Sequence, residues 1–171
     1  VDSYAYCTPL GGIAKTPTLS LKHERQADFS GGAAVVAKHL RQAGAAVRLS
    51  TVLGDDPLKD FVLQDLAACG ITCDAVLDRT RPTTRKTVFI AGGYRVLKVD
   101  TLDNRPISDK LLEQLVEALS RSAAEAFIFS DYRHGIFSRA TIPQLTGCLP
   151  AGALRVADSQ VASRWGNTLD F

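Results

Sequence analysis

The order of apolar and polar residues predicts a helix followed by a strand near the start of the chain. Apolar side chains recur with helical spacing over residues 31–43, and Gly44 stands where a left-handed helix end is expected. Residues 46–53 then alternate as in a strand, before an acidic turn. Glycine has no Cβ, so Gly31 and Gly32 at the start of this helix let the backbone approach a ligand closely. The alternative is that these two glycines only shape a turn.

Further helices alternate with short apolar runs in the rest of the chain. Continuous apolar runs of this length are typical of buried parallel strands. The expected helices begin at Asp56 and Ser108 and cover residues 138–145, and the expected buried strands are 126–130 and 154–158. Helices that alternate with buried strands predict an α/β fold, with a parallel sheet covered on both faces.

Two regions instead alternate with the strict period of two that is typical of antiparallel hairpins. Residues 1–28 do so around a turn at 9–12, and residues 74–103 do so around Gly92-Gly93. Hairpins do not belong in a parallel sheet. We therefore expect them to form a separate lid.

Composition narrows the class of protein. The 171 residues suit one domain, and the net charge of +2, with no basic arm, gives no sign of a nucleic-acid partner. No apolar run approaches the roughly 20 residues that span a bilayer, and no signal peptide is recognisable, so no membrane partner is expected. The four cysteines lack paired C-x-x-C spacing, which favours free thiols in a reducing cytoplasm over a zinc site or disulfides.

The chain starts at Val1 and contains no methionine, which favours a trimmed piece of a longer protein. We therefore expect a fragment.

A cluster of cations lies in the second hairpin region. No acidic residue separates its members, which are Arg79, Arg81, Arg85, Lys86, Arg95 and Lys98. Clustered cations raise the local concentration of anions, which favours a site for a phosphorylated ligand. The alternative is a solvated sheet edge that its charges protect from pairing.

The segment "SDYRHG" follows directly on the expected strand 126–130. In open α/β sheets, ligands gather at the carboxyl ends of strands. Asp131 would there accept hydroxyl hydrogen bonds or hold a metal-bound water, and Arg133 and His134 would meet phosphate. The alternative is that Asp131 only caps the following turn. Phosphate-loop, dinucleotide and nucleophile-elbow motifs are absent from the sequence.

Six segments in order carry a resemblance to a known family. They are "VDSYAYC", "GGAAVVAKHLRQAGA", "VLGDD", "TTRKTVFIAGGYRVLKVD", "FSDYRHG" and "VADSQ". Together they resemble the ribokinase-like (PfkB) carbohydrate kinases, most of all the branch that phosphorylates a heptose 7-phosphate.

The resemblance implies a Rossmann-like sheet and a small β lid, with lid segments at about 3–28 and 74–103. Such a lid closes over the sugar and often mediates a homodimer. The residues implied to bind a phosphorylated sugar are Asp2, Gly31, Gly32, Lys86, Arg95, Lys98 and Asp131, beside Arg133 from the loop above.

The chain also departs from the family pattern. Val35 and His134 stand where the family has asparagine and lysine, and Gln160 lies in a changed D-P-K-G segment. The family's G-A-G-D motif, with its catalytic aspartate and anion hole, would lie beyond Phe171, and the strand that usually precedes Asp2 is missing. ATP and Mg²⁺ are therefore expected cofactors of the full-length protein only, and this chain alone is expected to be inactive.

The function expected from the sequence is the sugar-binding part of an ATP-dependent phosphosugar kinase. Its acceptor would be a hydroxyl of a heptose 7-phosphate or a related sugar phosphate. Two alternatives are a sugar sensor that lost transfer chemistry, which the changes at Val35, His134 and Gln160 favour, and a purely dimerising module.

Overall fold

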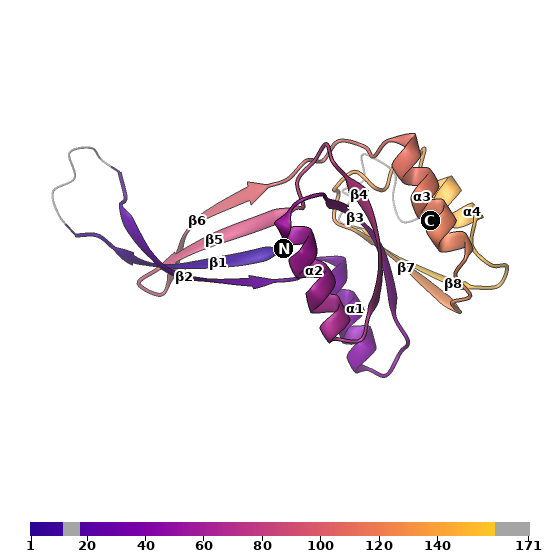
Figure 1. Ribbon diagram of the computed structural model, residues 1–171, viewed down its shortest axis with the longest axis horizontal. Coiled ribbons are helices and arrows are strands. Elements are labelled where there is room, and N and C mark those ends of the chain that lie inside the picture. Colours follow the sequence, from indigo (N-terminus) through magenta and orange to yellow (C-terminus); the bar gives the residue numbers. More distant parts are fainter. Residues whose placement is uncertain (12–17, 160–171) are drawn as a thin grey trace.

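The chain folds into an α/β part and a four-stranded sheet that projects from it, as Figure 1 shows. The computed structural model describes residues 1–11 and 18–159. The projecting sheet, which we call the lid sheet, contains β1 (Asp2–Pro9), β2 (Leu21–Phe29), β5 (Arg85–Ala91) and β6 (Tyr94–Thr101). The strands of the α/β part are β3 (Arg48–Gly54), β4 (Thr72–Asp78), β7 (Ala126–Asp131) and β8 (Leu154–Ser159). Its helices are α1 (Ala33–Gln42), α2 (Pro57–Ala68), α3 (Asp109–Ser120) and α4 (Ile142–Gly147).

The lid sheet confirms both predicted hairpins. Its strand order is β2-β1-β5-β6, with β1 antiparallel to β2 and β5 antiparallel to β6. The two hairpins join through β1 and β5, which pair in parallel. The first pair of opposite residues in this ladder is Asp2 and Lys86. Part of the first hairpin's predicted turn, Gly12, lies outside the described residues.

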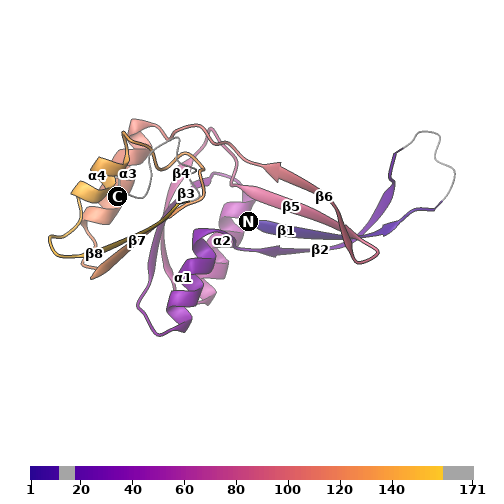
Figure 2. The same cartoon turned by 180° about the vertical axis from the view of Figure 1, so that it is seen from behind.

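The α/β part contains two parallel strand pairs where the sequence predicted one sheet. β3 pairs with β4, and β7 pairs with β8, and no hydrogen-bonded ladder joins the pairs within the part of the chain that the structure describes. Side-chain packing connects them instead, because α3 packs on β3 and β4 and also contacts α4. Figure 2 shows α1 and α2 beside β3 and β4, away from α3 and α4.

Residues 74–78, which were expected in the second lid segment, lie in the α/β part. They belong to β4, which pairs with β3 along its whole length, from Arg48 opposite Thr72 to Gly54 opposite Asp78. Strands of both sheets have the same period of two, so periodicity does not reveal which strand is the partner. The second half of the lid sheet begins only at Arg85.

The helix boundaries follow local chemistry. Asp56 caps α2 as predicted, since its carboxylate accepts hydrogen bonds from the backbone N–H groups of Leu58 (3.1 Å) and Lys59 (3.3 Å). The predicted helix over 138–145 is instead the shorter α4. Before it, the Thr141 hydroxyl accepts from the Ser138 N–H at 2.8 Å and donates to the Ile136 carbonyl at 2.7 Å, which holds a turn.

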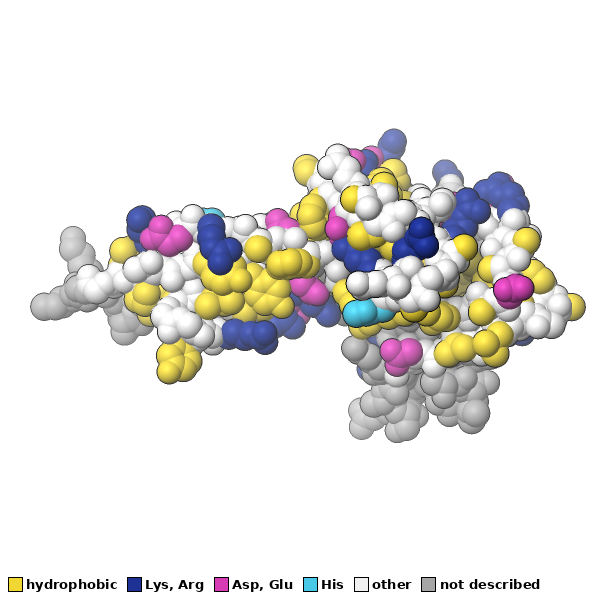
Figure 3. Space-filling view, turned by 90° about the horizontal axis from the view of Figure 1, so that it is seen from below, with side chains coloured by type: hydrophobic (Ala, Val, Ile, Leu, Met, Phe, Trp, Pro, Cys, Tyr) yellow, Lys and Arg dark blue, Asp and Glu magenta, His cyan; other side chains and the backbone are white. Residues whose placement is uncertain are grey.

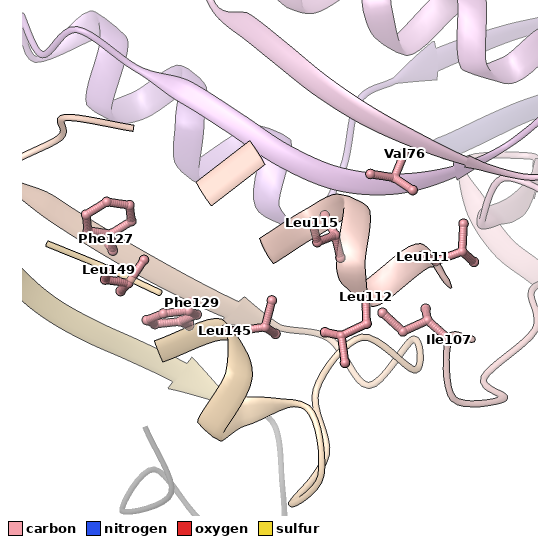
Figure 4. Packing of buried hydrophobic residues seen from close by; sticks show 9 residues of the cluster. All are labelled: Val76, Ile107, Leu111, Leu112, Leu115, Phe127, Phe129, Leu145 and Leu149. Atoms are coloured by element: carbon pink, nitrogen blue, oxygen red, sulfur yellow. The ribbon is translucent and has the colours of Figure 1, made fainter. Parts of the chain in front are cut away.

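Two apolar clusters stabilise the α/β part. The first lies between α3, α4 and the strands β4 and β7, and Figure 4 shows its side chains. Its buried members are Val76, Ile107, Leu111, Leu112, Leu115, Phe127, Phe129, Leu145 and Leu149. The second lies on the opposite face of β3 and β4, under α1 and α2, and contains Ala34, Ala37, Leu53, Val62, Leu66 and Ile71. None of the described helices has the length and apolar character needed to cross a bilayer.

Candidate functional site

A cavity of about 290 Å³ lies where the lid sheet meets the α/β part. Its wall comes from the start of β1, the glycine turn before α1, the end of β3, the segment 81–86 and the loop 130–137. The charged and polar side chains in the wall include Asp2, Ser30, Lys86, Asp103, Asp131 and His134. A concave site with a few converging polar groups is the usual form of a small-molecule site.

Gly31 and Gly32 bring three segments together at this cavity. A Cβ on Gly31 would lie only 2.3 Å from Oδ2 of Asp2, so the carboxylate at the start of β1 rests directly against this glycine. Gly32 has φ of +56°, and a Cβ there would touch the Tyr132 ring at 3.5 Å. The glycine pair thus shapes a turn and also permits the close approach of Asp2 and Tyr132, and the approach of a ligand to it stays a prediction.

A partly buried polar cluster holds the turn before Gly31 in place. The buried Ser30 hydroxyl donates to Asp65 on α2, and Lys38 Nζ of α1 lies 2.5 Å from the same carboxylate. Burial alone would raise the pKa of Asp65, but the hydrogen bonds from Lys38 and Ser30 lower it. The ionised carboxylate therefore ties α1, through Lys38, and the turn before it, through Ser30, to α2.

Asp131 lines the cavity and also caps its own loop. Its Oδ1 accepts from the Arg133 N–H at 2.7 Å, and its Oδ2 accepts from the Ser159 hydroxyl at 2.8 Å. Arg133 adopts φ of +63°, which is uncommon for a residue other than glycine. Asp131 therefore does cap the following turn, and it also lines the cavity.

Arg81 is a structural anchor. Its Nε lies 2.6 Å from Asp78 Oδ2, and the two side chains are only 8% and 6% exposed. The guanidinium also donates to the carbonyls of Arg105 (3.1 Å), Pro106 (3.2 Å) and His134 (3.3 Å). Through these hydrogen bonds, Arg81 connects the segment before β5 to the loop that contains His134.

The predicted cation cluster does not converge on one point. Arg79 pairs with Asp55 at 3.3 Å, Arg85 donates to the Ser3 hydroxyl at 2.9 Å, and Lys98 pairs with Asp100 at 3.2 Å. Of the cluster, only Arg81 and Lys86 border the cavity. Lys86 is therefore the cation of this cluster that is placed to meet a ligand there.

The structure brings together five of the eight predicted site residues. The cavity wall contains Asp2, Gly31, Gly32, Lys86 and Asp131. It does not contain Arg95, Lys98 or Arg133. The first two lie on β6, an exposed strand on the far side of β5, so a sheet spacing separates them from the wall. The changed position Gln160 lies outside the described residues.

Sequence reasoning missed most residues of the wall, and three of them carry polar side chains near the predicted ones or in a separate segment, namely Ser30, Tyr132 and Asp103. Ser30 and Tyr132 are the sequence neighbours of the predicted site residues Gly31 and Asp131, and this adjacency could have predicted them as part of the wall. Asp103 had no such signal, because it follows β6 in an irregular segment. Hydrogen bonds from Arg105 lower the pKa of Asp103 to about 2, so this carboxylate is ionised at neutral pH.

His134 faces the cavity and should respond to pH. Its Nδ1 lies 2.9 Å from Asn104 Oδ1. Burial first, and then the charge of Lys86, lower the pKa of the imidazole, against the opposing carboxylates of Asp131 and Asp100. Between this lowered pKa and the usual value of about 6.5, the unfolded chain binds more protons than the folded chain. Stability contributed by His134 is therefore complete above pH about 6.5 and is lost as the pH falls below it.

We expect sulfate to bind more tightly at pH 5.5 than at pH 8 because an anion beside His134 favours the imidazolium. Sulfate keeps its charge over this range, unlike phosphate. The measurement is an NMR titration at both pH values. The variant His134→Asn should lose most of the pH dependence, and His39→Asn, on the exposed surface of α1, should keep it. Equal pH dependence in the two variants would contradict this expectation.

Potential metal ligands do not gather in threes in the part of the chain that the structure describes. Nowhere in residues 1–11 and 18–159 do three His, Cys, Asp or Glu side chains lie close enough together to hold a metal ion. The carboxylates, the ammonium group and the hydroxyl in the cavity wall can bind the polar groups of a small-molecule ligand.

Comparisons with known proteins point to one family. Residues 4–135 match the family model described as pfkB family carbohydrate kinase. The chain is 36% identical over 138 residues to Bifunctional protein HldE of Hyphomonas neptunium, covering 77% of this chain and 28% of that protein. It is 34% identical over 125 residues to Bifunctional protein HldE of Helicobacter pylori strain 26695, covering 71% of this chain and 27% of that protein. The chain thus spans less than a third of these curated relatives.

Solved structures share the fold at low sequence identity. A putative phosphofructokinase from Staphylococcus aureus matches with a TM-score of 0.70 and 15% identity, over 92% of this chain and 49% of that one. The phosphofructokinase-2 from Escherichia coli, solved in complex with fructose-6-phosphate, matches with a TM-score of 0.69 and 14% identity, over 95% of this chain and 52% of that one. At these identities the likeness shows the fold alone, a ribokinase-like α/β fold.

Proposed function

Because this chain belongs to the pfkB family of carbohydrate kinases, we propose that it forms the sugar-binding part of an ATP-dependent phosphosugar kinase. The observation that carries the proposal is the meeting of Asp2, Lys86 and the Gly31-Gly32 turn at one cavity. A carboxylate accepts hydrogen bonds from sugar hydroxyls, and an ammonium group attracts a phosphate. The cavity therefore offers complementary groups to both ends of a sugar phosphate.

The acceptor that we propose is a hydroxyl of a heptose 7-phosphate or a related sugar phosphate. The resemblance of the six segments to the heptose 7-phosphate branch supports the heptose. The complex of phosphofructokinase-2 with fructose-6-phosphate supports a sugar phosphate more generally. Residues of this chain would orient the acceptor, a contribution of several kcal/mol to phosphoryl transfer.

Phosphoryl transfer itself also needs ATP, Mg²⁺ and donors around the transferred group. When bound, Mg²⁺ neutralises charge that develops on the phosphates. We propose that the full-length protein, acting in the cytoplasm, supplies the catalytic aspartate and anion hole from residues beyond Phe171. We expect that the 171 residues by themselves bind the sugar phosphate without phosphorylating it.

A homodimer through the lid sheet is part of the proposal. The outer strand β6 is exposed at every position, including the apolar residues Tyr94, Leu97 and Val99. An exposed edge of this kind readily pairs or packs with a second copy.

We expect Lys86→Gln to weaken the binding of fructose 6-phosphate by about 10- to 100-fold, the range for a lost hydrogen bond to a charged group. Isothermal titration calorimetry on the 171-residue chain measures this effect. Lys110→Gln, an exposed lysine of α3, is the matched control and should leave the affinity unchanged. If the chain binds no sugar phosphate at all, the dimerising alternative replaces this proposal. If the full-length protein binds the sugar phosphate but never transfers phosphate to it from ATP, the sugar-sensor alternative replaces this proposal.

A further inference from the structure

Three side chains of different chemistry lie side by side at the root of the lid sheet. Asp2 on the central strand β1 is opposite Phe29 on β2 and opposite Lys86 on β5. Residues that are opposite one another on neighbouring strands point to the same face, with about 4.8 Å between strands. A carboxylate, an aromatic ring and an ammonium group therefore form one row on the same face of the sheet.

The row continues the wall of the cavity. Asp2 and Lys86 line the cavity, and Phe29 directly precedes its Ser30-Gly31 turn. In Figure 3, basic and apolar side chains lie next to one another on the lid sheet, up to its junction with the α/β part. Phe29 itself is not among the lining residues, but it neighbours Asp2 across the sheet and Ser30 along the chain, and both of these line the cavity.

The Phe29 ring is braced and still open to solvent. It makes an edge contact with Tyr4 on the same face, with ring centroids 5.8 Å apart and an angle of 73° between the rings. The side chain nevertheless stays 54% exposed. Single exposed apolar residues are common on protein surfaces, so exposure alone carries no meaning. This ring is distinguished by its place in the row, because it lies directly beside Asp2, which lines the cavity together with Lys86.

A sugar phosphate has three kinds of surface. Its hydroxyls suit a carboxylate, its phosphate suits an ammonium group, and the C–H bonds of one face of its ring suit the negative face of an aromatic ring. We propose that Phe29 is a stacking residue for the sugar ring, beside Asp2 for the hydroxyls and Lys86 for the phosphate. This assignment rests on the proposed function and names a further binding residue of the same site.

The test compares Phe29→Leu with the unchanged 171-residue chain, using fructose 6-phosphate as the probe. We expect the affinity to fall by about three- to tenfold, the range for one aromatic contact. NMR supplies a second readout, because the ring current of Phe29 should move the sugar C–H signals upfield on binding. Phe29→Leu should abolish this shift, and Phe29→Tyr should retain it.

Two controls separate stacking from other roles. Tyr94→Leu removes a 77% exposed ring at the far turn of the same sheet and should change neither readout. Inorganic phosphate, which has no ring, should bind equally well to Phe29→Leu and to the unchanged chain. The assignment is overturned if fructose 6-phosphate binds to Phe29→Leu with full affinity, or if phosphate binding falls in parallel. Failure of the unchanged chain to bind any sugar phosphate would instead overturn the proposed function.

Discussion

Replacing Arg81 by methionine should lower the free energy of unfolding by about 3–5 kcal/mol, the usual cost of removing one partner of a buried ion pair. The change leaves the buried Asp78 carboxylate without its cation and removes donors from the carbonyls of Arg105, Pro106 and His134. Because hydrogen bonds from Thr80 and Arg81 lower the pKa of Asp78 despite its burial, this carboxylate is charged at neutral pH in the folded chain. Urea denaturation followed by circular dichroism measures the loss.

Two further variants test whether the loss of stability comes from the buried pair of Arg81 and Asp78. Arg79→Met removes a neighbouring cation that is 86% exposed, and its effect should stay within about 0.5 kcal/mol. The double variant Asp78→Asn, Arg81→Met leaves no buried charge unpaired, and its asparagine can still accept from the Thr80 N–H. It should lose less stability than the sum of the two single variants. If Arg81→Met and Arg79→Met lower the free energy of unfolding equally, the buried pair stabilises the fold no more than an exposed cation does.

Replacing Gly31 by alanine should weaken the binding of fructose 6-phosphate by about 10- to 100-fold, the range for lost hydrogen bonds to a charged group. The new Cβ would lie 2.3 Å from Oδ2 and 2.8 Å from Cγ of Asp2, so the carboxylate must leave its present position. The atoms that must move belong to a side chain and not to backbone, so stability should fall by no more than about 1 kcal/mol. Calorimetric titration and thermal unfolding of the same sample give the two quantities.

The control for this variant is Gly147→Ala. Gly147 is the last residue of α4, and a Cβ there would meet nothing within 4 Å. This change should leave sugar-phosphate binding intact and raise stability by up to about 1 kcal/mol, since alanine favours helix more than glycine does. Full affinity in Gly31→Ala would show that the position of the Asp2 carboxylate is unimportant for the ligand.

Much of the fold was predictable because its local signals are strong. Asp56 followed by Pro57 predicted the start of α2, and Gly44, whose φ is +100°, follows α1 in the left-handed conformation that was expected. Alternation predicted both hairpins of the lid sheet. The assignment of residues 74–78 to the lid was wrong, because alternation identifies a strand but not the strand that it pairs with.

The candidate site was predictable where its residues sit in short local motifs. Gly31, Gly32 and Asp131 stood out from their neighbours in sequence, and they do line the cavity. The cation cluster was less informative, since it combined the buried anchor Arg81, the surface pairs of Arg79 and Lys98, and the cavity residue Lys86. Only the partners of each charge, which come from distant segments, separate these roles.

By itself, the sequence determined the helices α1, α2 and α3, the hairpins and the glycine turn, because spacing and capping act over a few residues. Tertiary structure decided the rest. It set the row of Asp2, Phe29 and Lys86, which depends on the register between three strands that are far apart in the chain. It also decided that the Arg81 guanidinium pairs with Asp78 and donates to the carbonyls of Arg105, Pro106 and His134. Burial and hydrogen-bond partners of this kind exist only once the chain has folded.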